Sequence, residues 1–445
     1  MKKQVLLCFC CVFMLVTRSP ASDYQCEHFT INSDLDPRFV RFIETNAEAY
    51  FKNLKSLYSL RSWQEPLLIY YSRTQSDTQE LLNEHGHRYK VGFGYYARKI
   101  PALYSPNVSA VYSHQIMDNG RRTTWGHLFH EITHHFIRLT YDKPPAWFNE
   151  GLASFLGEQT QIVNKRITIG RPDPWREQIL RDKIEEGLRP NIKRFFSTSD
   201  EQFYNWDVGH HFARAFFYWM HENGYLKDYL RNVRRKGYEL SVLEETISQT
   251  YGKINVALSR FIKQYCYAGA YLQDSRQADD QTQKEQALLK ALELKPDYKA
   301  AQLELAKCCY HNKNYEKCRE SLNLVLDDPE CIEYRQAVTL LASTYYAQKN
   351  YFQALKHYKL GWKYSDYYEH KYRLAYKLGN CYHHLKNYER AKIWYKKFLD
   401  CRWEPESMKA QADYALKYIQ HSDNETDAEQ SKVRVNPADK REIKP

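Results

Sequence analysis

Apolar residues recur along most of this chain at the three- and four-residue spacing of amphipathic helices. This spacing predicts helices over 37–60, 123–136, 208–224, 226–231 and 254–266. The first quarter of the chain also contains short runs rich in Val, Ile, Tyr and Phe, which predict strands at 66–71, 91–96, 101–104 and 109–112. The pattern therefore predicts an α/β subdomain over 22–118, followed by a helical subdomain over 119–274.

Beyond residue 284 the helical pattern repeats itself. The tripeptide Lys-Asn-Tyr occurs at 313–315, 349–351 and 386–388, at intervals of 36 and 37 residues. Each copy follows a helix that contains Leu-Ala or Leu-Gly. Each also precedes a helix with a small residue at the close-packing position, namely Cys318, Ala354 and Ala391. This helix–turn–helix period resembles the tetratricopeptide repeat and predicts an all-α solenoid over 284–420.

Solenoid repeats bury their apolar faces against one another and expose a concave surface. Two roles stay open for this array: it docks a protein partner or substrate, or it extends and caps the part that precedes it. The polar segment 275–283 predicts a linker between the two parts. The charged and polar residues 421–445 predict a disordered tail.

The first 21 residues have the pattern of a secretory signal. Lys2 and Lys3 precede a twelve-residue apolar run, 5–16, and small residues at 19–21 offer a cleavage site. That run is shorter than the roughly 20 residues of a membrane-spanning helix. No other segment approaches that length, so we expect no membrane span. The pattern predicts signal cleavage and export to a periplasmic or extracellular space.

Charge and cysteine content narrow the possible partners and sites. The net charge is +11, but the basic residues are interleaved with 54 acidic ones and no glycine-rich phosphate loop occurs. This distribution is typical of a solvated surface and predicts no nucleic-acid partner. Eight cysteines follow the signal, and none forms a CxxC pair that would predict a cysteine zinc site. An even number in an exported chain permits one or two disulfides without requiring them.

The pentapeptide His-Glu-Ile-Thr-His at 130–134 is the strongest chemical signal. Residues four apart share one face of a helix, so His130 and His134 offer two imidazoles to one metal ion. Glu131 lies beside them and is the expected general base, which takes a proton from a water that the metal activates and passes it to the leaving amine.

A Pro-Pro turn at 144–145 ends the connection after this helix, and a second helix begins near Trp147. Glu150 on that helix is the expected third ligand, which leaves the open coordination position that a catalytic zinc requires. The alternative is a buried polar patch without a metal. Burying two His and two Glu together is costly without a cation, so the residues favour one zinc ion per chain.

A metzincin would need Gly and His three and six positions after His134, where Ile137 and Thr140 stand. The string Trp-Phe-Asn-Glu-Gly-Leu-Ala-Ser at 147–154 instead resembles the gluzincin peptidases, especially zinc aminopeptidases and thermolysin-like enzymes. The resemblance extends more weakly over 29–266. It implies a thermolysin-like α+β catalytic domain that hydrolyses peptide bonds, with a sheet whose edge strand pairs with extended substrate.

The chain also departs from the best-known gluzincins. It has no segment like Gly-Ala-Met-Glu-Asn, and its expected edge strand is 101–106. The acidic residues that hold a free substrate N-terminus in aminopeptidases are not evident, so an endopeptidase fits better. Family members use a downstream Tyr or His to hold the oxyanion. His210 is the first candidate for this role and Tyr204 the second, and an ordinary surface His or packed Tyr is the alternative for each.

These observations predict an exported zinc metallopeptidase that acts on a peptide or protein substrate, with a repeat array that docks the substrate or a partner protein. The alternative is a non-catalytic tetratricopeptide-repeat scaffold with a degenerate peptidase domain. The ambiguous oxyanion donor favours the scaffold. The presence of two His ligands, a base and a third-ligand helix favours the enzyme.

Overall fold

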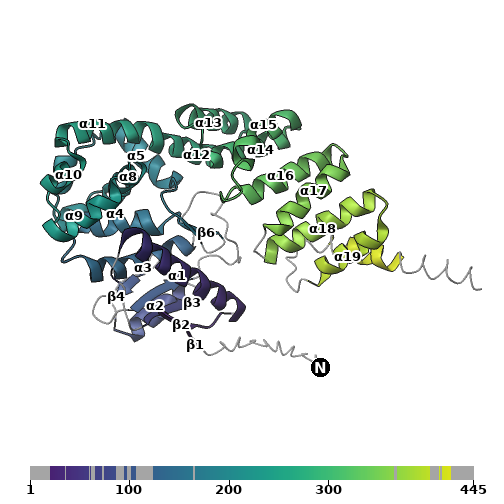
Figure 1. Ribbon diagram of the computed structural model, residues 1–445, viewed down its shortest axis with the longest axis horizontal. Helices are drawn as coiled ribbons and strands as arrows, with labels where there is room; N and C mark the ends of the chain where they lie inside the picture. The colour runs from purple at the N-terminus through teal and green to yellow at the C-terminus, as the bar shows by residue number, and fades with distance from the viewer. Residues whose placement is uncertain are drawn as a thin grey trace, which may run out of the picture.

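The computed structural model describes residues 21–35, 37–59, 61, 66–72, 75–86, 95–97, 102–106, 124–163, 166–364, 368–400, 410 and 413–421. They form a mostly helical N-terminal unit with a small sheet, followed by an array of paired helices (Figure 1). Residues 1–20 of the predicted signal, the predicted strand at 109–112 and residues 422–445 of the predicted tail lie outside the described residues. Within the described residues no helix is both long and apolar enough to cross a membrane.

A five-stranded sheet lies at one end of the N-terminal unit. Its strands, in spatial order, are β1 (Ser22–Gln25), β2 (Phe29–Ser33), β3 (Leu67–Ser72), β5 (Ala102–Pro106) and β4 (Tyr95–Ala97). The three central strands are parallel, and β1 and β4 add antiparallel edges. The prediction that the strand near 101–106 is an edge strand is wrong, because β5 pairs with both β3 and β4. Strand order depends on how the connections cross over, which the local pattern does not contain.

Three helices share one hydrophobic core with the sheet: α1 (Pro37–Tyr58), α3 (Thr124–Thr140) and α4 (Ala146–Gly157). α1 connects the parallel strands β2 and β3, and α2 (Gln75–Glu84) follows β3. The ring of Tyr50 on α1 stacks on Phe129 of α3, with the centroids 4.3 Å apart. The Tyr50 hydroxyl shares a 2.6 Å hydrogen bond with Thr133 Oγ1. These contacts fix the rotation of α3 against α1.

The rest of the N-terminal unit is a two-stranded hairpin and further helices. Their bounds are β6 (Gln161–Val163), β7 (Arg166–Thr168), α5 (Pro174–Glu185), α6 (Ile192–Phe196), α7 (Asp200–Tyr204), α8 (Gly209–Glu222), α9 (Leu226–Lys236), α10 (Leu240–Ile247) and α11 (Tyr251–Phe261). α4 is buried on nearly every face, in keeping with its largely apolar composition. Trp147 on α4 contacts four aromatic rings from α6 and α8, those of Phe195, Phe196, Phe216 and Phe217.

The C-terminal array is a solenoid of helix pairs. Its helices are α12 (Tyr267–Gln277), α13 (Gln281–Leu294), α14 (Lys299–His311), α15 (Tyr315–Leu326), α16 (Tyr334–Ala347), α17 (Tyr351–Lys363), α18 (Tyr368–His384) and α19 (Tyr388–Leu399). α12 packs against both α5 and α13, so the array continues directly from the N-terminal unit. The predicted boundary at 274 falls inside α12, and the predicted linker contains the end of α12 and the start of α13.

The recurring Lys-Asn-Tyr tripeptide forms the turn between the two helices of a pair. Its lysines, Lys313, Lys349 and Lys386, adopt φ values of 59°, 61° and 55°. The following asparagines cap the second helix, each accepting a hydrogen bond from a backbone N–H three residues on. Capping by Asn and its tolerance of turns explain why the motif recurs in phase.

Replacing Asn350 by Ala removes the cap of α17. We expect the free energy of unfolding to fall by about 1 kcal/mol. Denaturant unfolding followed by circular dichroism measures the change, with Asn350→Asp as a control because Asp caps equally well. Equal stability of Asn350→Ala and the wild type would contradict this role.

Candidate metal centre

Two imidazoles on α3 face each other at the centre of the N-terminal unit. His130 and His134 lie four residues apart on α3, and their Nε2 atoms are 3.0 Å apart. The rings are nearly perpendicular, at 85°, with centroids 4.6 Å apart. Both side chains are largely buried, with exposed fractions of 9% and 11%. The helical spacing thus brings both Nε2 atoms to one point.

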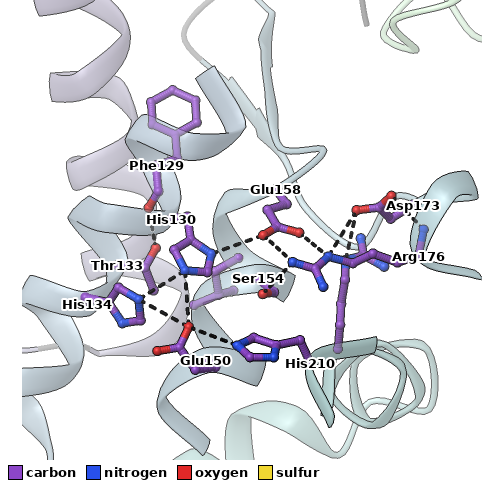
Figure 2. Close-up of polar contacts among 12 residues, drawn as sticks. Phe129, His130, Thr133, His134, Glu150, Ser154, Glu158, Asp173, Arg176 and His210 are labelled. Atoms are coloured by element: carbon purple, nitrogen blue, oxygen red, sulfur yellow. Dashed lines mark hydrogen bonds and ion pairs between the residues drawn. The ribbon is translucent and has the colours of Figure 1, made fainter. Parts of the chain in front are cut away.

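Glu150 from α4 completes a cluster of three potential ligands (Figure 2). Its Oε2 lies 3.5 Å from His130 Nε2 and 3.6 Å from His134 Nε2. Ligand atoms around a tetrahedral zinc ion with bonds of 2.0–2.1 Å are about 3.3 Å apart. The three measured separations lie close to that value, so the residues fit a metal ion of this size.

Glycines allow α4 to approach α3 closely enough to place Glu150. A Cβ atom on Gly157 would lie 2.3 Å from the backbone N of His130. On the other side of α4, a Cβ atom on Gly151 would lie 2.8 Å from the Cβ of Ala213. Any larger residue at these positions pushes α4 away from α3 or from α8.

We expect Gly157→Ala to lower the free energy of unfolding by about 2–3 kcal/mol through overpacking and to weaken metal binding by displacing α4. Gly252→Ala is the matched control, because Gly252 is also helical and has open space where its Cβ would lie. Thermal unfolding and zinc titration of both variants check this. Retention of wild-type stability and zinc affinity by Gly157→Ala would show that the close approach is dispensable.

Acceptors outside the cluster orient both imidazoles. His134 Nδ1 lies 3.1 Å from Asn149 Oδ1, and the amide of Asn149 is oriented by its Nδ2 donating to Glu150 Oε1 at 3.5 Å. His130 Nδ1 lies 3.3 Å from Glu158 Oε1, an ion-pair contact without hydrogen-bond geometry. These acceptors favour a proton on each Nδ1, so both Nε2 lone pairs point into the cluster. Two such lone pairs 3.0 Å apart repel each other unless a cation or proton lies between them.

The charges of the cluster reinforce one another. Burial opposes ionisation of His130, yet the carboxylates of Glu150 and Glu158 raise its pKa to about 10. Burial likewise opposes ionisation of Glu150, but the imidazoles of His134 and His130 hold its pKa well below the ordinary value. The cluster therefore favours positive charge beside Glu150. Metal ligation requires neutral imidazoles, so a metal ion would displace these protons and supply the positive charge itself.

Glu158 is a site residue that sequence reasoning missed. It is the C-cap of α4, outside the pentapeptide and outside the helix that carries Glu150. Its carboxylate is fully buried and accepts two hydrogen bonds from the guanidinium of Arg176 on α5, at 2.5 and 2.8 Å. The only signal in the sequence was a charged residue directly after the mainly apolar run 152–157.

The structure also locates the expected base and the two oxyanion candidates. Glu131 is partly buried on α3, and its charge contributes to the raised pKa of His130. The Tyr204 hydroxyl donates a 3.1 Å hydrogen bond to Glu150 Oε1. His210 Nε2 lies 3.9 Å from Glu150 Oε2. Tyr204 and the His210 side chain are 53% and 33% exposed, so the neighbours of Glu150 on α7 and α8 border solvent.

A second group of potential ligands lies at the start of the chain, formed by Glu27, His28 and Glu48. Glu48 already accepts hydrogen bonds from the His28 backbone N–H and contacts His28 Nδ1, both at 2.7 Å. Glu27 is exposed and pairs with Lys52 at 2.7 Å. These carboxylates are engaged within the protein, so this group is the weaker candidate.

Among the described residues, no cysteine belongs to a group of potential metal ligands. Seven of them fall within the described residues, and all seven are free: Cys26, Cys266, Cys308, Cys309, Cys318, Cys331 and Cys381. Burial is the main reason why the pKa of Cys26 is raised to about 12 and that of Cys309 to about 11. The described cysteines are therefore thiols, of which five are buried and two, Cys26 and Cys331, are partly buried.

Comparison with known proteins identifies part of the C-terminal array. A match to the tetratricopeptide repeat family covers residues 285–341, which run from α13 into α16. A search of curated proteins finds no match to the chain. The chain thus contains tetratricopeptide repeats, and the helix pairs seen in the structure have the arrangement that such repeats adopt.

We expect the protein to bind one zinc ion per chain, and His134→Ala or Glu150→Ala to weaken binding by more than about 100-fold, since loss of an outer partner alone costs 10–100-fold. Competition with a chromophoric chelator measures the affinity. His28→Ala is the control and should leave the affinity unchanged. Loss of zinc from the control instead would place the site at the second group.

Proposed function

We propose that the N-terminal unit is a zinc-dependent peptidase of the gluzincin type and that the tetratricopeptide repeats dock its substrate or a partner protein. The observation that supports this most strongly is the convergence of His130, His134 and Glu150. Glu131, directly after the first ligand, has the position of a general base in this class. We further propose that the protein is exported, as the pattern of residues 1–21 indicates.

The proposed reaction divides roles among the residues of the cluster. When bound, zinc would acidify water and polarise a peptide carbonyl. Glu131 takes a proton from the attacking water and returns it to the leaving amine. Tyr204 and His210 lie on the solvent side of Glu150, where either can donate a hydrogen bond to the oxyanion.

Residues outside the cluster keep its side chains in this orientation. Asn149 Oδ1 is a hydrogen-bond partner of His134 Nδ1, and the Glu158 carboxylate lies beside His130 Nδ1, so the Nε2 atoms are left to bind the metal. Glu150 has two oxygens, and the Tyr204 hydroxyl contacts Oε1 while the imidazoles contact Oε2. The carboxylate thus presents Oε2 to the two imidazoles and would hold a metal ion together with them.

The second candidate function is a repeat scaffold whose N-terminal unit does not turn over substrate. The family match favours it, because that match covers only the repeats. The two candidates differ in one property that can be measured, namely chelator-sensitive hydrolysis of peptides.

Glu131→Gln should lower the rate of peptide hydrolysis by about 10²–10⁴-fold, the usual contribution of a general base, while zinc stays bound. Cleavage of a quenched peptide library measures the rate, and metal analysis measures the zinc content. Glu201→Gln is the control, because Glu201 is an exposed carboxylate on nearby α7. Full activity of Glu131→Gln would remove this residue from the mechanism. Inert wild-type protein would favour the scaffold.

The same library separates endopeptidase from aminopeptidase activity. Blocking the substrate N-terminus should leave cleavage intact in an endopeptidase, the form that the sequence favours. Loss of cleavage on blocking would identify an aminopeptidase instead.

A further inference from the structure

Residues 170–173 lie between β7 and α5, and we call this segment the strap. Three of its four residues make contacts that restrain it. Gly170 has φ +78°, and a Cβ atom there would lie 2.6 Å from the ring of His221. The backbone oxygen of Arg171 accepts a 2.7 Å hydrogen bond from Arg214 on α8. Asp173 caps α5 by accepting from the backbone N–H of Arg176. The strap therefore has little freedom to move.

A series of buried charged side chains links the strap to His130 (Figure 2). Asp173 Oδ2 lies 3.6 Å from Arg176 Nε, and Arg176 binds both oxygens of Glu158. Glu158 Oε1 in turn lies 3.3 Å from His130 Nδ1. The exposed fractions of these three charged side chains are 0%, 2% and 0%. Charges without access to water interact strongly and depend on good geometry, so a shift of one displaces its neighbours.

The other side of the strap reaches the repeats. The guanidinium of Arg171 forms an ion pair with Glu333, the N-cap residue of α16. Both side chains are mostly withdrawn from solvent, with exposed fractions of 14% and 11%. This pair joins a loop of the N-terminal unit to the third helix pair of the array, across 162 residues of sequence.

α5, which carries Arg176, also packs against α12, the first helix of the array. A Cβ atom on Gly269 of α12 would lie 1.5 Å from Glu177 Oε2, so the two helices touch at that point. Gln178, the next residue on α5, donates a 2.7 Å hydrogen bond to Asp274 of α12, and Arg181, one turn further along, pairs with the same carboxylate. The array thus holds α5 from one side while the strap holds its N-terminus.

We propose that the repeat array stabilises the metal-binding orientation of His130, through the Glu333–Arg171 pair, the strap and the buried charges of Asp173, Arg176 and Glu158. The inference rests on metal binding at the centre proposed above. A protein that draws α16 away from Arg171 would weaken metal binding. By reciprocity, metal binding strengthens the attachment of α16. The repeats in this way stabilise the metal centre and do not act independently of it.

The test is a double-substitution cycle on the full chain with zinc as the probe. Glu333→Gln and Arg171→Gln should each weaken zinc binding by about 3- to 30-fold, the range seen for residues that couple distant sites. The double variant should be no weaker than the weaker single variant, because both substitutions break one pair. Glu285→Gln is the matched control, because Glu285 pairs with Lys317 entirely inside the array.

Hydrogen exchange gives an independent reading of the same coupling. Zinc should slow exchange of backbone amides at the start of α16 in the wild type and in Glu285→Gln, and should have a smaller effect in Glu333→Gln. The coupling would be overturned if Glu333→Gln and Arg171→Gln bound zinc with wild-type affinity and zinc slowed exchange at α16 in Glu333→Gln as much as in the wild type. That result would leave the metal centre itself in place. Failure of the wild type to bind zinc would overturn the metal centre as well. If one single variant does not fold, the other carries the affinity test.

Discussion

The close packing of α4 across α3 is the constraint on which the candidate site depends. Two histidines one turn apart come together on any helix, but Glu150 reaches them only if the second helix crosses almost at backbone contact. Gly157 allows that contact on one side of α4, and Gly151 allows the equally tight packing on α8. The aromatic cluster around Trp147 also fixes the position of α4 by packing it against α6 and α8. The ligand geometry is thus a product of core packing.

The cluster places several ionisable side chains where burial makes their ionisation unfavourable. His130, Glu150 and Glu158 are all withdrawn from water, and burial alone opposes ionisation of both His130 and Glu150. Mutual attraction offsets that cost, as the raised pKa of His130 and the lowered pKa of Glu150 show. An arrangement of this kind contributes little to stability compared with an apolar core of equal volume. Its persistence is understandable if the cluster serves a cation.

Much of this organisation could be predicted from local sequence. The spacing of His130 and His134 placed both on one helix face, and the Lys-Asn-Tyr motif located the turns of the repeats. Local sequence failed where the answer depended on contacts between distant elements. The interior position of β5 follows from the order of the strands. The pairing of Glu158 with Arg176 and of Arg171 with Glu333 joins segments that no periodicity links.

The most direct test of the account is a zinc-soaked crystal structure with anomalous diffraction measured at the zinc edge. The account predicts one anomalous peak per chain, bonded to the Nε2 atoms of His130 and His134 and to Glu150 at about 2.0–2.2 Å. Absence of a peak there, or a peak only at Glu27, His28 and Glu48, would contradict it.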